Sequence, residues 1–266
     1  MDVLSVFIAR KRRRPQETDS HDAPPRPTVE KQKEHHDADF EHIHWSYHEE
    51  ESAPDKWQDL CGAFSACGGT AQSPIDIVPA NAQRDAHLKP IQVHYGKTKV
   101  NIVNNGHTIQ FNVDEGNTAN FNGKEYKLQQ FHFHALSEHT VNGQHFPIEA
   151  HFVHKLGDND LAVLGIFFKE GKSNPLFEKY LDNFPAEKGN FTAGDELDLM
   201  SILPGDLSYY TYNGSLTTPP CSEIVTWYVL KTPVEASREQ IERFSKILHD
   251  NYRPTQPLNG RRVETF

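Results

Sequence analysis

Gln130-Phe131-His132-Phe133-His134 is the stretch that decides both the fold and the chemistry of this chain. Successive side chains of a β-strand point to opposite faces, so His132 and His134 share one face and the two phenylalanines occupy the other. In a second stretch, Glu149-Ala150-His151-Phe152-Val153, the same alternation puts Glu149 and His151 on one face. If the two strands pair, three imidazoles converge, and three neutral nitrogen ligands are typical of a catalytic zinc site with one open position.

The chemistry of such a site follows from its charge. Three neutral ligands leave the charge of a zinc ion uncompensated, and that charge lowers the pKa of a bound water to about 7. This predicts attack of zinc-bound hydroxide on a small electrophilic carbon. Histidine ligands usually donate their second ring nitrogen to an oxygen acceptor, and Gln130 and Glu149 share faces with the histidines and suit that role. A core position is the alternative for His132 or His134 alone, and the addition of His151 favours the metal.

The rest of the chain indicates one domain dominated by strands. Turn signals such as Asn104-Asn105-Gly106 and Asn122-Gly123 separate segments rich in β-branched and aromatic residues, and short connections favour antiparallel pairing. The segments predicted as strands are Lys99–Val103, His107–Val113, Tyr126–His134, Ile148–His154, Leu161–Lys169 and Ile224–Val234. We expect a mainly β fold, a single domain built on a large, mostly antiparallel twisted sheet with peripheral helices.

Two helices are predicted beside this sheet. Ser237 and Gln240 form a capping box ahead of apolar residues at helical spacing, which are Ile241, Phe244, Ile247 and Leu248. A second helix is expected to begin at Asn174-Pro175, with Pro175 at the first helical position and Leu176, Phe177, Tyr180 and Leu181 facing inward.

Residues 1–42 differ in composition from residues 43–266, which we take as the catalytic domain. A short apolar run, Val3 to Ala9, precedes the basic cluster Arg10 to Arg14, and charged residues and prolines follow without period. We expect a flexible, charged, histidine-containing tail, because such a segment has little apolar surface to offset the cost of ordering. The apolar run is too short to span a bilayer and lacks the features of a signal peptide, although it fits the remnant of a longer signal. The net charge of −10 and the lack of a basic surface pattern argue against nucleic acid as a partner.

Six blocks, taken in order, resemble the α-class carbonic anhydrases. They are Gln72 to Ile77, Asn104 to His107, Gln130 to His134, Ser137 to Val141, Glu149 to His154 and Ser215 to Pro220. The resemblance extends from His44-Trp45-Ser46-Tyr47 to Gln256-Pro257-Leu258-Asn259 and so covers nearly all of the expected domain. It implies the family's fold and a zinc lyase that interconverts carbon dioxide and bicarbonate, with sulfonamides and anions as inhibitors.

The resemblance also implies roles for particular residues. His132, His134 and His151 would bind Zn²⁺, while Thr217 would accept a hydrogen bond from the zinc-bound hydroxide and donate its own proton to Glu138. His107 matches the proton shuttle, and the residues that match positions ordering water between the shuttle and the metal are Tyr47, Asn105 and Gln110. A turn residue is the alternative for Thr217, which precedes two prolines, and for His107.

The remaining matched positions concern the substrate. Thr218 would lie beside the bicarbonate product. The residues matching the apolar wall of the substrate pocket are Val153, Val163, Leu216, Val225 and Trp227. Such a wall suits carbon dioxide, which offers few polar groups to recognise. Ordinary core packing is the alternative for these side chains.

The three cysteines bear on the compartment. Cys67 and Cys221 match the disulfide of exported members of the family, which favours a periplasmic or secreted enzyme because disulfides persist in oxidising compartments. No signal peptide is visible, so a cytoplasmic enzyme is the alternative. Cys61 is then a free thiol or a link to a second subunit, and a homodimer is expected by analogy with bacterial relatives.

Three other functions compete with this hypothesis. A catalytically weak or dead binding module of the same fold is disfavoured because all three histidines, Glu138 and Thr217 are present. A zinc esterase would use the same hydroxide, but no additional acid–base pair indicates a dedicated one. Metal storage would be centred on the histidines of the tail, for which a solvated linker is the simpler interpretation.

Overall fold

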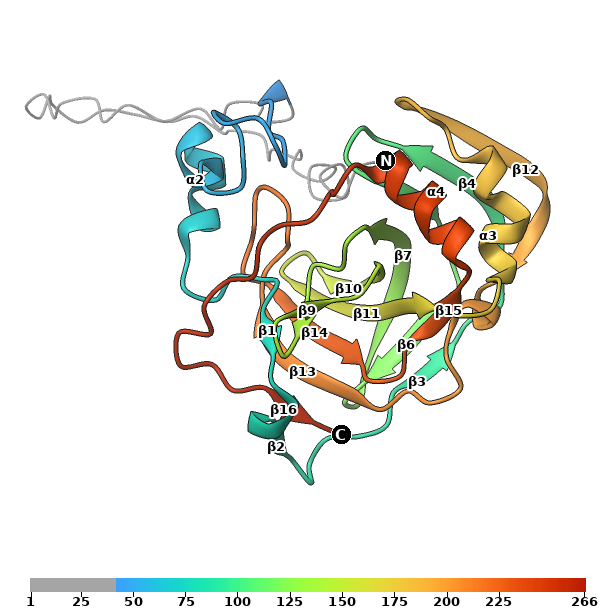
Figure 1. Cartoon of the computed structure of the whole chain (residues 1–266). Coiled ribbons are helices and arrows are strands. Elements are labelled where there is room, and N and C mark those ends of the chain that lie inside the picture. The colour runs from blue at the N-terminus through green and yellow to red at the C-terminus, as the bar shows by residue number, and fades with distance from the viewer. Residues whose placement is uncertain (1–41) are drawn as a thin grey trace, which may run out of the picture. The chain divides into compact units, whose positions relative to one another are not determined.

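A large twisted β-sheet forms the framework of the domain (Figure 1). The computed structural model describes residues 42–266, so the expected N-terminal tail lies outside the described residues except for His42. The strands are β1 (Asp76–Ile77), β2 (Gln83–Arg84), β3 (Gln92–His94), β4 (Lys97–Asn104), β5 (Ile109–Asn112), β6 (Thr118–Phe121), β7 (Lys124–His134), β8 (Thr140–Val141), β9 (Gln144–His145), β10 (Ile148–Gly157), β11 (Asp160–Glu170), β12 (Gly189–Asp198), β13 (Tyr209–Gly214), β14 (Val225–Leu230), β15 (Val234–Ala236) and β16 (Glu264–Thr265).

The main sheet has the strand order β12-β4-β5-β7-β10-β11-β14-β13-β16-β2, with β3, β6 and β15 paired beside this path. Most neighbours are antiparallel, as expected from the short connections. The pairing of β11 with β14 is parallel, because the chain leaves β11 at Glu170 and returns at Val225 only after a long excursion. A small second sheet joins β1, β8 and β9. The predicted mainly β fold on a large, mostly antiparallel sheet is therefore confirmed.

Five of the predicted strands match the structure to within three residues at either end, and the sixth is divided in two. The segment Ile224–Val234 is divided into β14 and β15 by a turn that contains Pro233. The segment His107–Val113 begins only at Ile109, because the Asn105 side chain accepts hydrogen bonds from the backbone N–H groups of His107 and Thr108, both at 2.9 Å. This side-chain turn keeps His107 outside the strand, in the connection between β4 and β5.

The helices are few and peripheral. They are α2 (Trp57–Leu60), α3 (Pro175–Tyr180) and α4 (Arg238–Leu248), with 3-10 helices at Gly62–Gly68, Pro79–Asn81, Leu181–Asn183 and Leu199–Ile202. Both predicted helices are confirmed: Ser237 and Gln240 form the capping box of α4, and the Asn174 side chain accepts from Leu176 N at the start of α3. No helix within residues 42–266 is long and apolar enough to cross a bilayer.

The core lies on the phenylalanine face of β7. Phe131 stacks between Phe111 of β5 and Phe152 of β10, with ring centroids 4.7 Å from each. Phe133 packs against Phe177 of α3 and Phe244 of α4, at 5.6 and 5.1 Å. The two helices thus bury this face of the sheet, and the histidine face is left to line the site.

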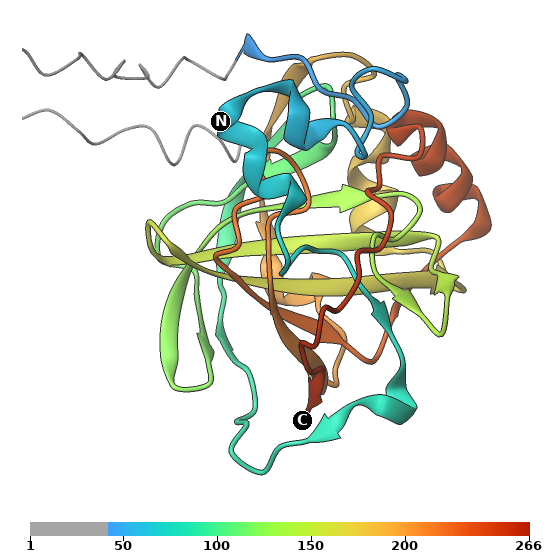
Figure 2. The same ribbon diagram turned by 90° about the vertical axis from the view of Figure 1, so that its left-hand side faces the viewer.

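The register of β5, β7, β10 and β11 brings the predicted metal ligands together. In β7 and β10, His132 lies directly opposite His151, and in the outer neighbours Gln110 of β5 lies opposite His132 while Gly165 of β11 lies opposite His151. The four residues form one row across the centre of the sheet. The turned view shows the long strands β10 and β11 crossing the middle of the domain (Figure 2).

Candidate metal centre

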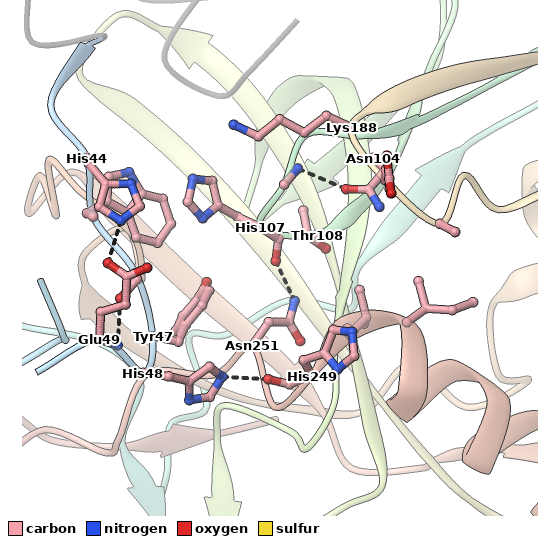
Figure 3. A pocket seen from close by; sticks show the side chains of 17 residues that line it. His44, Tyr47, His48, Glu49, Asn104, His107, Thr108, Lys188, His249 and Asn251 are labelled. Atoms are coloured by element: carbon pink, nitrogen blue, oxygen red, sulfur yellow. Dashed lines mark hydrogen bonds and ion pairs between the residues drawn. The ribbon is translucent and has the colours of Figure 1, made fainter.

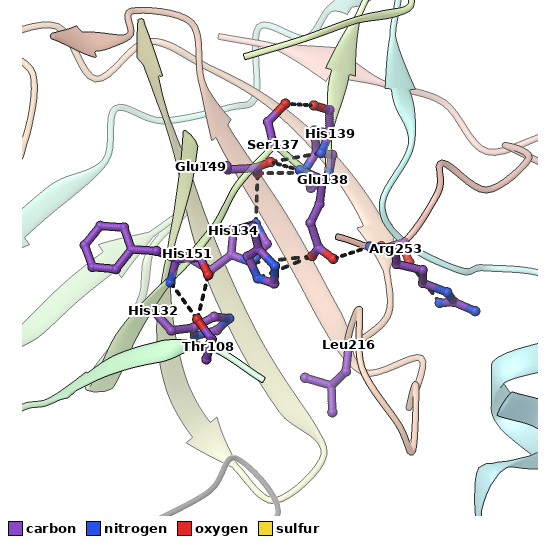
Figure 4. A network of polar contacts seen from close by, with 12 residues as sticks. Thr108, His132, His134, Ser137, Glu138, His139, Glu149, His151, Leu216 and Arg253 are labelled. Atoms are coloured by element: carbon purple, nitrogen blue, oxygen red, sulfur yellow. Dashed lines mark hydrogen bonds and ion pairs between the residues drawn. The ribbon is translucent and has the colours of Figure 1, made fainter. Parts of the chain in front are cut away.

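Three histidines from β7 and β10 converge on one point (Figure 4). One nitrogen from each of His132, His134 and His151 lies within 4.8 Å of the other two. Each ring is oriented through its second nitrogen: His132 Nδ1 is 2.8 Å from Gln130 Oε1, His134 Nδ1 is 2.7 Å from the Asn251 carbonyl oxygen, and His151 Nε2 is 2.9 Å from Glu149 Oε1. If each outer nitrogen donates, the inner nitrogens are Nε2, Nε2 and Nδ1, and each presents a lone pair.

The chemistry of this donor set fits a zinc ion. Metal binding requires neutral imidazoles. Burial, together with the neighbouring rings of the other two histidines, holds the pKa of His132 well below its usual range, and burial lowers the pKa of His134 to about 3. Within residues 42–266, His134 Nε2 is a buried atom without a hydrogen-bond partner, as expected of a ligand atom. Three imidazoles with one further position are the donor set of a catalytic zinc site.

Glu149 is the buried carboxylate that contacts the outer ring nitrogen of His151. Its carboxylate is fully buried and contacts His151 Nε2 at 2.9 Å and His139 Nδ1 at 2.8 Å, and it accepts from the backbone N–H groups of Glu138 and His139, both at 2.9 Å. Burial opposes its ionisation, but the charges and hydrogen bonds of His139 and His151 outweigh burial and hold the pKa of Glu149 well below its usual range. Gly165 makes room for it, because a Cβ there would lie 3.0 Å from Glu149 Oε1.

His139, Glu149 and His151 also lie close enough together to be considered as a metal site. Their separations of 2.8 and 2.9 Å are those of ordinary hydrogen bonds, and the second ring nitrogen of His139 is 2.6 Å from the Tyr212 hydroxyl. We therefore interpret this group as a hydrogen-bond network that supports His151.

Glu138 lies beside two of the ligand nitrogens and receives a hydrogen bond from Thr217. Glu138 Oε2 is 3.5 Å from His134 Nε2 and 3.8 Å from His151 Nδ1, and Glu138 Oε1 accepts from the Arg253 backbone N–H at 2.8 Å. Burial raises the pKa of Glu138 to about 7, against the opposing effects of His151 and of a hydrogen bond from Thr217. A dication held by the histidines would favour the ionised carboxylate. Tyr47 also lies near this charge, since burial and Glu138 raise the pKa of its hydroxyl well above the usual range.

The expected apolar wall lies in register beside the metal centre. Val153 of β10, Val163 of β11 and Trp227 of β14 are direct neighbours across three strands. The Trp227 ring is 4.7 Å from the His151 ring, and its Nε1 donates to the Ser215 carbonyl oxygen. Leu216 and Val225 are buried, and Thr218 is half-buried in the turn after Thr217.

His107 lies in the wall of a pocket of about 370 Å³ (Figure 3). Its ring stacks on Trp45, with centroids 3.7 Å apart and planes 9° apart. Burial, with the positive charge of Lys188 and the neighbouring His44, lowers the pKa of His107 to about 4 in this position. Of the two water-ordering candidates on this side, Asn105 forms the turn before β5, and Gln110 donates to the Asn112 side chain at 2.8 Å.

Cys67 and Cys221 form a disulfide, as the resemblance implied, and Cys61 is not part of it. The bond joins the Gly62–Gly68 helix to the turn that carries Thr217, where Cys221 N donates to the Thr218 carbonyl oxygen at 2.8 Å.

Three residues of the site were missed in the sequence. Asn251 accepts from His134 through its main chain and from Ala135 N through its side chain. Arg253 contacts Glu138, and His139 contacts Glu149. Asn251 and Arg253 lie a hundred residues or more from the ligands in the chain and carry no motif of their own, so only the folded structure brings them together. His139 lies within one of the matched blocks, but its fully buried ring was not foreseen.

The central strands of the sheet hold three converging histidines, an oriented carboxylate and an apolar wall. This combination defines the class of zinc enzymes whose metal is held by histidines. Comparison with known proteins gives the family. The family model for eukaryotic-type carbonic anhydrases matches residues 52–266. A carbonic anhydrase of Pectobacterium atrosepticum is 44% identical over 223 residues, which are 82% of this chain and 89% of that protein. One from Klebsiella pneumoniae is 43% identical over 226 residues, covering 83% and 90%.

Solved structures agree. The α-carbonic anhydrase of Thermovibrio ammonificans, in complex with the inhibitor sulfanilamide, is 48% identical, with a TM-score of 0.80 over 84% of this chain and 99% of that one. A hyperthermostable carbonic anhydrase from a hydrothermal vent chimney is 44% identical, with a TM-score of 0.79 over 84% and 100%. The chain belongs to the eukaryotic-type, or α-class, carbonic anhydrase family.

Proposed function

We propose that this chain catalyses the reversible hydration of carbon dioxide to bicarbonate and a proton, with Zn²⁺ held by His132, His134 and His151. The observation that carries the proposal is the fixed orientation of the three rings, whose outer nitrogens face Gln130, Asn251 and Glu149. A zinc ion bound there would supply hydroxide at neutral pH, because it lowers the pKa of a coordinated water to about 7. The protein's residues then orient the reactants and remove the proton.

Thr217 and Glu138 are proposed to aim the attacking hydroxide. Glu138 in its ionised form can only accept hydrogen bonds, so the Thr217 hydroxyl donates its proton to that carboxylate. The Thr217 oxygen would then be free to accept a hydrogen bond from the hydroxide that a bound zinc ion would supply, and Thr217 would so fix the orientation of that hydroxide towards the substrate carbon. The backbone contact from Arg253 to Glu138 Oε1 supports this orientation of the carboxylate.

The substrate is proposed to lie against Val153, Val163, Leu216, Val225 and Trp227. These side chains are all buried, and Val163 lies directly between Val153 and Trp227 across the neighbouring strands. A small apolar molecule is favoured there because it loses no hydrogen bonds to water on binding. Thr218, which is half-buried beside this wall, would contact the more polar product.

His107 is proposed to carry the proton to buffer, with Tyr47, Asn105 and Gln110 ordering water on its path. An efficient carrier has a pKa near the working pH. The pKa of about 4 in the Trp45 stack is too low for this, so the protonated ring would leave the stack for a more hydrated position.

The test is stopped-flow hydration of carbon dioxide by the full chain, with and without a zinc chelator, and by His151→Ala. We expect activity to depend on zinc and to fall to background in the variant. Hydration that persists after loss of both zinc and His151 would refute the proposed function. A catalytically dead module would instead bind zinc with no hydration at all.

Three further properties are proposed. Sulfonamides and anions would inhibit, by analogy with the sulfanilamide complex of the Thermovibrio enzyme. The Cys67–Cys221 disulfide favours a periplasmic or secreted location. A homodimer is expected, which sedimentation analysis of the purified chain would test, with and without reductant to detect a bond through Cys61.

A further inference from the structure

Arg253 is a buried cation that touches two different parts of the site (Figure 4). Its backbone N–H donates to Glu138 Oε1, whereas its guanidinium donates to three neutral oxygens: Gln72 Oε1 at 2.7 Å, the Ser73 carbonyl at 2.9 Å and the Cys67 carbonyl at 3.0 Å. The residue is 1% exposed, its two NH₂ groups donate only to these neutral oxygens, and its Nε has no hydrogen-bond partner among residues 42–266. These neutral oxygens therefore hold the Arg253 side chain in place. The side chain in turn positions the Arg253 backbone N–H, which donates to Glu138.

These anchors reach both halves of the disulfide. The guanidinium contacts Cys67 directly, and Gln72, which it also binds, donates from Nε2 to the Cys221 carbonyl oxygen at 3.1 Å. Cys221 in turn holds the Thr217 turn through its backbone N–H, which donates to the Thr218 carbonyl. Thus Glu138 is attached to the disulfide through Arg253, and Thr217 is attached to the same disulfide through Cys221.

Because the Arg253 guanidinium is charged and buried, its position depends on the oxygens that accept its hydrogen bonds. Burial lowers the pKa of Arg253 to about 10, and the negative charge of Glu138 opposes that effect. The guanidinium also lies 5.4 Å from the centre of the Trp57 ring. A buried guanidinium that loses a carbonyl partner retains an unsatisfied donor, so the residue shifts towards water or another acceptor rather than staying in place.

We infer that Arg253 is a positioning residue that couples the Cys67–Cys221 disulfide to the Glu138 carboxylate, so that forming the disulfide sets the orientation in which Glu138 meets Thr217. The inference rests on the role proposed above for Glu138. Reduction of the disulfide would then slow the hydration step while leaving the three zinc ligands in place. The enzyme would be fully active only after oxidation.

The experiment is a double-mutant cycle on the full-length chain. Carbon dioxide hydration is measured per bound zinc for the parent, for the disulfide-free Cys67→Ser/Cys221→Ser variant, for Arg253→Met and for their combination. We expect each change to lower kcat/KM by about 10- to 100-fold, the loss typical of a misplaced reacting group. The combination should fall no further than the worse single change, because both act through one chain of contacts. Losses that multiply would overturn the coupling.

Two readouts separate positioning from general damage. Partial unfolding lowers kcat and kcat/KM together, whereas a misaligned Glu138 lowers kcat/KM more than it lowers kcat in weak buffer, where proton export is limiting. Arg253→Lys should restore part of the loss, since it keeps a buried donor. Arg238→Met is the control: the Arg238 guanidinium pairs with the exposed Glu170 on the surface and takes no part in the contacts between Arg253 and the disulfide. It should therefore leave kcat/KM unchanged, with the disulfide and without it.

Two further arms keep the outcomes distinct. Arg253→Met added to Glu138→Gln should cost little beyond Glu138→Gln alone, and a full additional loss would mean that Arg253 acts elsewhere. If Glu138→Gln by itself leaves kcat/KM unchanged, the proposed role of Glu138 fails rather than the coupling. Should Arg253→Met not fold, reduction of the parent with dithiothreitol, followed by thiol counting, replaces it: unchanged kcat/KM per zinc after full reduction overturns the inference.

Discussion

Replacement of Glu149 by glutamine should weaken zinc binding although the new side chain has almost the same shape. Glu149 is surrounded by four donors, two of them backbone N–H groups. A glutamine can keep its oxygen toward the backbone donors only by turning its NH₂ toward His139 and His151. His151 Nε2 must then accept, so its proton moves to Nδ1, the atom that faces the metal centre.

The magnitude follows from the lost orientation. Removal of a carboxylate behind a histidine ligand typically costs about 10- to 100-fold in metal affinity, or roughly 1.4 to 2.7 kcal/mol. The opposite amide orientation is no better, because it sets the NH₂ group against two backbone donors and leaves them unsatisfied, at about 1–3 kcal/mol each. We therefore expect the dissociation constant for zinc to rise by at least about tenfold.

The assay is competition for zinc between the protein and a chromophoric chelator, for the parent and for Glu149→Gln. Glu170→Gln is the control, because Glu170 is an exposed carboxylate at the end of β11 that pairs with Arg238 on the surface. We expect the control to bind zinc as the parent does. An affinity of Glu149→Gln within about threefold of the parent would refute the assignment of the His151 tautomer.

Other changes test other parts of the molecule. His107→Ala should slow turnover in weak buffer by roughly tenfold or more, with partial rescue by added imidazole, and turnover that is independent of buffer would place the shuttle elsewhere. His154, whose ring nitrogen is 2.5 Å from the Tyr95 hydroxyl, has a pKa lowered to about 3 by burial. Because the unfolded chain takes up this proton near pH 6.5, stability is complete above that pH and falls by ~2.7 kcal/mol towards pH 4.5. In urea unfolding, His154→Gln should lack this part of the pH dependence, and a slope equal to that of the parent would contradict the assignment. Cys67→Ser opens a loop with a sequence separation of 154 and should destabilise the fold by about 5 kcal/mol in the chain-entropy model, although measured values are often about 2–4 kcal/mol. A change below about 1 kcal/mol in denaturant unfolding would show that the reduced chain is restrained by other contacts.

Local pattern was sufficient to predict the centre of the fold. The alternation in Gln130 to His134 correctly separates the metal-facing histidines from the phenylalanines that pack against α3 and α4. The capping box at Ser237 and the Asn174-Pro175 start are confirmed because both depend on residues within one turn of each other. Strand faces and helix starts can be predicted from the sequence because they depend on residues that are close together in the chain.

Long-range features were less accessible. The parallel pairing of β11 with β14 depends on a connection of more than fifty residues, whose path no local signal encodes. Asn251 and Arg253 reach the site only because the chain after α4 passes behind Glu138 and His134. The stack of His107 on Trp45, and the low pKa that results, depends on where an N-terminal segment lies against the Asn105 turn. Such contacts join residues that lie far apart in the chain and at no regular interval, so no sequence pattern predicts them.

Zinc binding depends on the register of the strands. One row across four strands contains Gln110, His132, His151 and Gly165. Because side chains alternate with a period of two, a slip of β10 by a single residue against β7 would turn His151 to the phenylalanine side of the sheet and leave two ligands. A chain in the wrong register therefore binds the metal more weakly, whereas the correct one is stabilised by RT ln(1 + [Zn²⁺]/Kd). In a cell that supplies zinc, the cofactor would thus favour the correctly assembled sheet before any carbon dioxide is bound.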